Sequence, residues 1–227
     1  DHAGGAGTLM HARPTATLLA HPRAARHLID PTKLVASATA VYGEETFARV
    51  YGEITPIPKE RVRVLEDGET FELGGETLRV MHTLGHAKHH FVVIDEPQGT
   101  VFTGDAFGLV YPRLQRAGTF ALPSTSPTDF DPEQAIASVS RIASLGSERL
   151  HLTHMGEVTD IQPAAEQLRQ FLARSAELLD QAKRKKDDPN LTAWLRAEVR
   201  RAVDEAAAKA ASRSTTPIGA CSRRTSP

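Results

Sequence analysis

Apolar residues recur along this chain with two different periods, which predicts separate strands and helices. Three short runs are β-branched, leucine-rich or aromatic and are flanked by polar or turn-forming residues, as buried strands are. These runs are residues 16–21 (ATLLAH), 91–95 (FVVID) and 100–102 (TVF). Residues 62–83 instead alternate apolar and polar positions, with turn signals at Asp67-Gly68 and Gly74-Gly75. We expect a β-meander there, which leads into the sequence HTLGHAKHH.

Helical spacing appears on both sides of these strands. Pro22 stands where a first helical position is expected, residues 31–54 have apolar positions near i, i+3 and i+4, and Asp131 can cap a helix over 131–145. Residues 148–154 (ERLHLTH) predict one more strand.

The last quarter of the chain carries two apolar helical stripes joined by KRKKDDPN, which predicts a helical hairpin packed on the main domain. We therefore expect a main domain over residues 1–160, a C-terminal helical extension over 161–210, and a disordered tail over 211–227, which lacks periodicity and aromatic residues.

The composition excludes several classes of function. The 227 residues carry a net charge of -1, so no global field favours nucleic acid or an anionic membrane, and we expect a small-molecule substrate instead. No apolar run approaches the ~18 residues that a membrane helix needs. Cys221 is the only cysteine, so no intramolecular disulfide is possible and a cytoplasmic location fits best. The oligomeric state is left open.

A group of possible metal ligands lies between residues 82 and 105. His86, His89 and His90 occupy a loop that contains Gly85, and Asp105 follows the second of two predicted strands. Any one of these histidines alone would ordinarily be a surface or core residue. Together with Asp105 they indicate a metal site, because imidazole and carboxylate ligands suit zinc, manganese or iron.

Four motifs follow one another in the chain: DHAGG at the start, HTLGHAKHH, TGD and LTHMG. In this order and spacing they resemble the metallo-β-lactamase-fold hydrolases over residues 1 to about 160. DHAGG is similar to the version found in glyoxalase II-type thioesterases and lactonases. The resemblance implies an α/β fold of the αββα sandwich type, with two mixed sheets flanked by helices. It also implies a metal-bound hydroxide that attacks a small thioester, lactone or ester.

The resemblance assigns roles residue by residue. It implies two divalent metal ions, with zinc favoured and iron or manganese as alternatives. The implied metal ligands are Asp1, His2, His86, Asp105 and His154. Asp1 and Asp105 are the implied catalytic residues, although Asp1 orients or deprotonates water instead of binding metal where a single ion is present. His90 matches a position behind the ligands, where it would support them.

Two departures from the family pattern affect these expectations. Leu84 replaces the usual proline, which removes a backbone constraint but leaves Gly85 to place His86. The chain also opens on Asp1 and His2 without a methionine, and we read it as a fragment. The resemblance then implies that the first strands and two further histidines are missing, so that the second metal site is incomplete and the fragment by itself is poorly active.

Three other functions stay open at this point. A mononuclear-iron sulfur dioxygenase would use an equivalent set of two histidines and one aspartate. A phosphodiesterase or nuclease of the same fold would be expected to show a basic groove, which the balanced charge does not favour. A non-catalytic binding protein of this fold would have no physical reason to keep five ligand-type residues.

Overall fold

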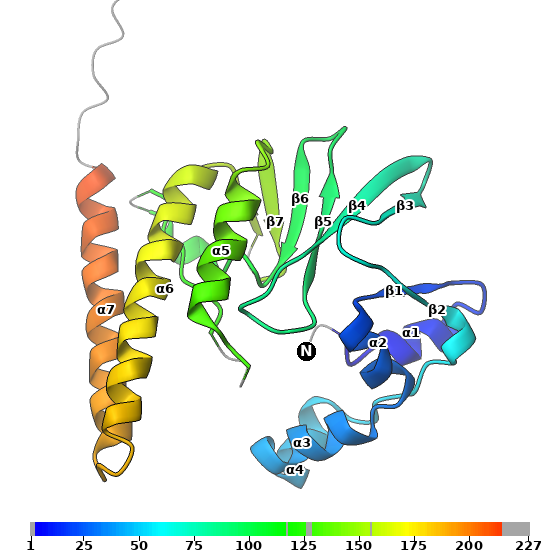
Figure 1. The fold of residues 1–227 in the computed structure, drawn as a ribbon, viewed down its shortest axis with the longest axis horizontal. Helices are drawn as coiled ribbons and strands as arrows, with labels where there is room; N and C mark the ends of the chain where they lie inside the picture. The colour runs from blue at the N-terminus through cyan, green and yellow to red at the C-terminus, as the bar shows by residue number, and fades with distance from the viewer. Residues whose placement is uncertain (1–2, 117, 126–128, 155, 215–227) are drawn as a thin grey trace, which may run out of the picture.

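The computed structural model describes residues 3–214 except 117, 126–128 and 155 (Figure 1). A mixed sheet forms its centre, with α5, α6 and α7 on one side, while α1 to α4 and a small second sheet form a group beside it. The strands are β1 (Leu18–Ala20), β2 (Val62–Val64), β3 (Thr70–Leu73), β4 (Glu76–His82), β5 (Phe91–Asp95), β6 (Thr100–Gly104), β7 (Arg149–Leu152) and β8 (Gly156–Val158). The helices are α1 (Ala6–Ala12), α2 (Pro22–Ile29), α3 (Thr32–Tyr42), α4 (Glu44–Val50), α5 (Pro132–Ala143), α6 (Ile161–Arg184) and α7 (Leu191–Ser214), with short 3-10 turns η1 (Lys59–Arg61) and η2 (Pro112–Leu114).

The large sheet has the order β3-β4-β5-β6-β7-β8, and its only parallel pair is β6 and β7. The predicted strands at 91–95 and 100–102 are confirmed, and so is the hairpin turn at Gly74-Gly75, which joins β3 to β4. The meander predicted over 62–83 was wrong at Asp67-Gly68. The chain does turn there, but β2 leaves to pair in parallel with β1, and β3 pairs only with β4. Strand β8 was not predicted.

The core lies between the large sheet and the two helices α5 and α6. Alternate side chains of strands β5, β6 and β7 point toward the two helices, and the apolar faces of α5 and α6 pack against those side chains. Its most deeply buried members, none more than 2% exposed, are Val92, Ile94, Val101, Val139, Ile142, Leu150, Leu168 and Leu172. Each such side chain contributes roughly 1.5–3 kcal/mol on burial. Helix α6 therefore packs on the main domain and shares its core, while the domain boundary at residue 160 stays a prediction.

The N-terminal part is held together by contacts between segments far apart in the sequence. Its small sheet pairs Leu18–Ala20 with Val62–Val64 in parallel. The guanidinium of Arg61 donates hydrogen bonds to the backbone carbonyls of Met10, Arg13 and Ala16. Helix α1 lies close against the chain at Thr55, since a Cβ on Gly7 would lie 1.9 Å from the Thr55 carbonyl oxygen. The predicted strand at 16–21 and the helix opened by Pro22 are both confirmed.

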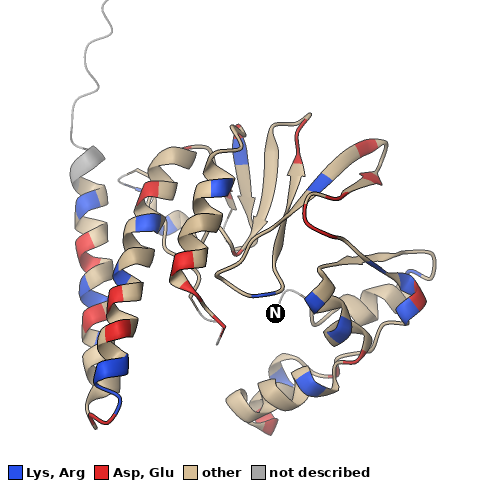
Figure 2. Cartoon of the chain, in the orientation of Figure 1, with Lys and Arg blue, Asp and Glu red and all other residues tan. Residues whose placement is uncertain are grey.

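The predicted C-terminal helical hairpin is also confirmed: α7 packs along α6. Glu198 is buried between the two helices and forms ion pairs with Arg174 at 3.0 Å and Arg201 at 2.7 Å. In Figure 2, the ribbon colours show acidic and basic residues interspersed along both helices. Helix α7 continues to Ser214, so residues 211–214 of the predicted disordered tail are helical, and 215–227 lie outside the described residues. None of the described helices is long and apolar enough to cross a membrane.

Candidate metal centre

Three of the predicted ligands follow strands that end at the same edge of the large sheet. Strands β4, β6 and β7 run in the same direction, because β5 is antiparallel to both β4 and β6, and β6 is parallel to β7. His86 lies in the loop after β4, Asp105 directly follows β6, and His154 lies two residues after β7. Residues 19 to 68 positions apart in the sequence are therefore brought together by the sheet.

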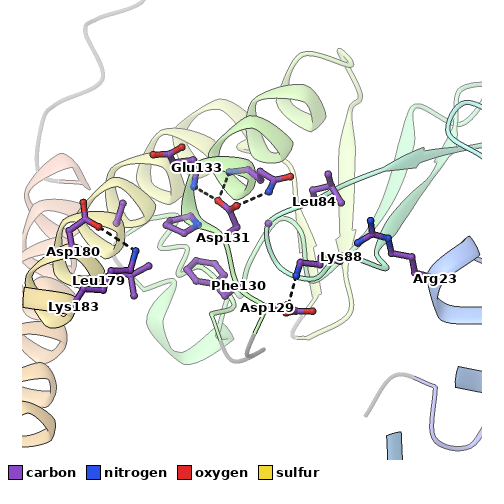
Figure 3. Close-up of a pocket in the computed structure, with 14 residues that line it drawn as sticks. Arg23, Leu84, Lys88, Asp129, Phe130, Asp131, Glu133, Leu179, Asp180 and Lys183 are labelled. Carbon is purple, nitrogen blue, oxygen red and sulfur yellow. Dashed lines mark hydrogen bonds and ion pairs between the residues drawn. The ribbon is translucent and has the colours of Figure 1, made fainter. Parts of the chain in front are cut away.

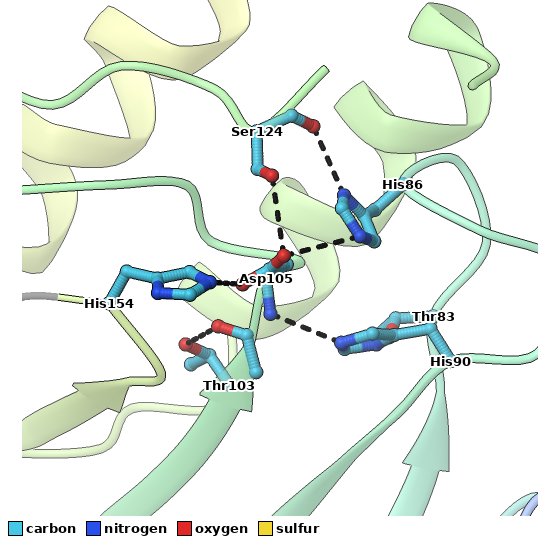
Figure 4. Close-up of polar contacts among 8 residues, drawn as sticks. Thr83, His86, His90, Thr103, Asp105, Ser124 and His154 are labelled. Carbon is cyan, nitrogen blue, oxygen red and sulfur yellow. Dashed lines mark hydrogen bonds and ion pairs between the residues drawn. The ribbon is translucent and has the colours of Figure 1, made fainter. Parts of the chain in front are cut away.

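The carboxylate of Asp105 lies between two imidazoles (Figure 4). Nε2 of His86 is 3.3 Å from Oδ2, and Nε2 of His154 is 3.5 Å from Oδ1. The Asp105 side chain is only 7% exposed. Both distances exceed the ~2.7–2.9 Å of a charge-assisted hydrogen bond. Two ligands that each lie about 2.1 Å from a tetrahedral zinc ion are roughly 3.4 Å apart, so the donor types and their spacing fit a divalent cation.

Ser124, in the loop between β6 and α5, contacts both His86 and Asp105. Its backbone carbonyl is 3.1 Å from Nδ1 of His86, and its hydroxyl donates to Oδ2 of Asp105 at 3.3 Å. A carbonyl can only accept, so Nδ1 of His86 carries the proton and Nε2 presents its lone pair to the site. Ser124 therefore selects the tautomer that a metal ligand needs.

His90 contacts the backbone of Asp105 and not its carboxylate. The backbone N–H of Asp105 donates to Nε2 of His90 at 3.1 Å, and Nδ1 of His90 lies 2.7 Å from the hydroxyl of Thr83. Gly104 is required beside this ring, because a Cβ there would lie 2.3 Å from Nε2 of His90 and the φ of Gly104 is +51°. The supporting role that we predicted for His90 is compatible with these contacts and stays a prediction.

The structure brings together part of the predicted ligand set. Asp1 and His2 lie outside the described residues. Within the residues that are described, no three His, Cys, Asp or Glu side chains are arranged to hold a metal ion by themselves. The contacts of Asp105 with His86 and His154 are thus a partial donor set, and the assignment of all five ligands stays a prediction.

Several other histidines form a separate cluster beside α2. Burial, and next the charges of His82, His89 and Arg23, together lower the pKa of His21 to about 4. The His21 and His82 ring centroids are 4.2 Å apart, and Nδ1 of His21 accepts the backbone N–H of Arg23 and so caps α2. Burial also lowers the pKa of His89. These contacts give His21 a structural role, which nothing in its sequence surroundings indicated.

A cavity of about 670 Å³ opens next to the site (Figure 3). Its walls come from the loop after β4, the start of α5, the second half of α6, and Arg23 of α2. Gly85, which lines it, directly precedes His86, and Phe130 lines both this cavity and a smaller void that touches His86 and Asp105. A small molecule in the larger cavity would lie beside the candidate metal centre.

Besides Phe130, the loop after β6 contains three aromatic residues, Phe107, Tyr111 and Phe120. Phe107 is 1% exposed and Phe120 is 4% exposed, so both are core residues. Tyr111 is 40% exposed and lines neither of the two cavities.

A family model described as the metallo-beta-lactamase superfamily matches residues 1–154. The chain belongs to this superfamily. Members of the metallo-beta-lactamase superfamily are generally metal-dependent hydrolases. The α/β fold class and the superfamily that the sequence predicted are confirmed, while the glyoxalase II-like branch stays a prediction.

Individual members of the superfamily match this chain at low sequence identity and over part of its length. A metallo-beta-lactamase fold-containing protein of Sulfurisphaera tokodaii is 31% identical over 144 residues, 63% of this chain and 50% of that protein. An atrochrysone carboxyl ACP thioesterase of Aspergillus novofumigatus is 25% identical over 125 residues, 53% of this chain and 34% of that protein. A solved structure of an archaeal superfamily protein from Sulfolobus tokodaii has a TM-score of 0.61 at 29% identity, covering 75% of this chain and 63% of that one. The chain spans about half the length, or less, of these two curated relatives.

Proposed function

We propose that this chain is a metal-dependent hydrolase that acts on a small thioester, lactone or ester. The observation that carries the proposal is the pair of imidazoles, from two different loops, that face the two oxygens of the buried Asp105 carboxylate. A shared carboxylate of this kind can bind two cations or orient the ligands of one. The cation would be held by His86, Asp105 and His154, with Asp1 and His2 as the further ligands that the motif implies.

When bound, such cations polarise a carbonyl group and make water a nucleophile near neutral pH. The residues of the chain prepare the site for that chemistry. The hydrogen bond from His86 to the Ser124 carbonyl keeps this imidazole in the ligating tautomer. The hydrogen bond from the Asp105 backbone to His90 fixes the point at which the carboxylate leaves β6. The low exposure of Asp105 excludes bulk water from one side of the centre.

Two observations favour an acyl substrate. The cavity beside His86 is about 670 Å³, within the range of small-molecule pockets. One relative is described as an atrochrysone carboxyl ACP thioesterase.

The test measures metal content and turnover on the same purified chain. We expect zinc or another divalent metal to be bound in proportion to protein, and hydrolysis of at least one of a panel of thioesters, lactones and aryl esters. Asp105→Asn is expected to lower kcat/KM at least 100-fold and to lower the bound metal. The matched control is Asp204→Asn, an exposed aspartate of α7 that lies 4.0 Å from Arg200 and lines neither cavity, and it is expected to leave both unchanged.

Three outcomes would replace the proposal. Oxygen consumption with a persulfide, together with one iron per chain, would support a sulfur dioxygenase, since two histidines and one carboxylate also suit that iron. Turnover of a phosphodiester but of no acyl substrate would support a phosphodiesterase. Bound metal without any turnover would support a binding protein.

A further inference from the structure

A glutamine of α6 holds the loop that reaches the candidate metal centre. Nε2 of Gln167 donates to the carbonyl of Thr119 at 2.7 Å, and the backbone N–H of Ala121 donates to Oε1 of Gln167 at 3.1 Å. Both ends of the side-chain amide are therefore used, one as donor and one as acceptor. This two-point contact fixes the position of residues 119–121 along α6.

Two segments of the loop also bond to each other, between the Gln167 contact and Ser124. The backbones of Leu109 and Leu122 donate to each other at 2.7 and 3.0 Å. The two limbs are in such close contact that a Cβ on Gly108 would lie 2.3 Å from the Leu122 carbonyl oxygen. Ala121 is only 2% exposed. A shift of the loop at Gln167 would therefore be passed along the return limb to Ser124, three residues after Ala121.

The position of Ser124 determines two hydrogen bonds to the predicted ligands His86 and Asp105. Its carbonyl accepts the Nδ1 proton of His86 at 3.1 Å, and its hydroxyl donates to Asp105 at 3.3 Å. Both contacts depend on where the backbone of Ser124 lies, because its side chain is short. A displacement of a few tenths of an ångström would lengthen both hydrogen bonds beyond their useful range.

We propose that Gln167 is a positioning residue for the candidate metal centre, which it controls through Ser124. The proposal rests on the proposed function in one respect, that the site of His86 and Asp105 binds a cation. It gives α6 a role in the site although no residue of α6 contacts His86 or Asp105 through a described hydrogen bond or ion pair. The effect expected on removing such support is about a tenfold loss of metal affinity, since outer contacts of metal ligands are typically worth 10–100-fold.

The test compares Gln167→Leu with Gln162→Leu. The leucine at 167 keeps a similar volume and removes both hydrogen bonds to the loop. Gln162 is the matched control, because it lies on the same helix and donates one side-chain hydrogen bond to the Ala143 carbonyl of α5 at 2.8 Å, away from the loop. Gln167→Glu is the second variant: it keeps the acceptor for Ala121 and loses the donor to Thr119, so it serves if the leucine variant does not fold.

Two readouts are needed. The first is the tautomer of His86, followed by nitrogen-15 NMR of the imidazole in metal-free protein. The second is zinc affinity, measured by competition with a chelator. We expect wild type and Gln162→Leu to show a single Nδ1-protonated His86 and equal zinc affinity within twofold. In Gln167→Leu we expect mixed or broadened His86 signals and about tenfold weaker zinc binding, with a comparable effect in Gln167→Glu, because its second carboxylate oxygen would repel the Thr119 carbonyl.

Failure of this inference and failure of the proposed function give different results. If His86 keeps one tautomer and zinc affinity stays within twofold in both Gln167 variants, Gln167 does not position the site. If wild type binds no zinc but His86 changes only in the Gln167 variants, the positioning role stands and the metal-dependent hydrolase does not. If Gln162→Leu produces the same changes as Gln167→Leu, the effect is general to α6 and the inference is overturned.

Discussion

Acidification is expected to destabilise this protein through one buried histidine, His21. Its imidazole is 6% exposed, lies 4.2 Å from the His82 ring, and accepts the backbone N–H of Arg23 at the start of α2. Burial, and next the charges of His82, His89 and Arg23, lower its pKa from 6.5 to about 4. A proton on Nδ1 would also remove the acceptor that caps the helix.

The direction of the pH effect follows from how many protons the folded and unfolded states bind. Below pH 6.5 the unfolded chain takes up a proton on His21, but the folded chain does so only near pH 4. The folded state therefore binds fewer protons between these values, and its stability falls as the pH falls through this window. The interval is about 2.5 pH units, and at about 1.4 kcal/mol per unit it corresponds to about 3.5 kcal/mol for the whole titration, of which about 3 kcal/mol falls between pH 7 and pH 4. This is a large part of the ~5–15 kcal/mol that stabilises a typical domain.

The measurement is urea unfolding at a series of pH values from 7 to 4, with Asn in place of His21. Asparagine cannot titrate but can still cap α2. We expect wild type to lose about 3 kcal/mol more than His21→Asn over this range, although the variant is less stable at pH 7 because it loses the ring contact with His82. His11→Asn, at an exposed position on α1, is the control and is expected to follow wild type. If the free energy of unfolding changes with pH by the same amount in wild type and in His21→Asn, the reasoning is refuted.

Three further predictions concern the loop, the core and the site. In thermal unfolding, Gly85→Ala is expected to destabilise the fold by about 3 kcal/mol or more, because the φ of Gly85 is +112° and a Cβ would lie 2.1 Å from a backbone nitrogen of α5. The control is Gly74→Ala, also at positive φ but in open space, which should cost only about 1 kcal/mol in the same assay. Leu168→Ala is expected to cost about 2–5 kcal/mol and Leu179→Ala less than about 1, since the two side chains are 0% and 41% exposed; equal costs in urea unfolding would contradict the packing described. His90→Leu is expected to weaken zinc binding about tenfold, and unchanged affinity in a chelator competition would show that its contact with the Asp105 backbone does not matter.

The sequence by itself determined the local elements and the family. Strands such as 91–95 follow from short β-branched runs, and α5 follows from Asp131 and Pro132 at its start, because these signals act over a few residues. The four motifs and their order were sufficient to predict the superfamily. His86, Asp105 and His154 are predicted as ligands because ligand chemistry restricts which residue types can serve, and that assignment stays a prediction.

Tertiary structure decided what depends on contacts between distant segments. Strand β2 pairs with β1 and not with β3, although Asp67-Gly68 is a turn signal, because pairing is set by which strand the fold brings alongside. Ser124 and Gln167 carry no motif, and only the fold shows that Ser124 contacts the side chains of His86 and Asp105 and that Gln167 contacts the backbone of Thr119 and Ala121. His21 looks like a surface residue in the sequence and is buried by a neighbour 61 positions away, His82. Local chemistry therefore predicts candidate ligands, while packing decides which other residues contact them.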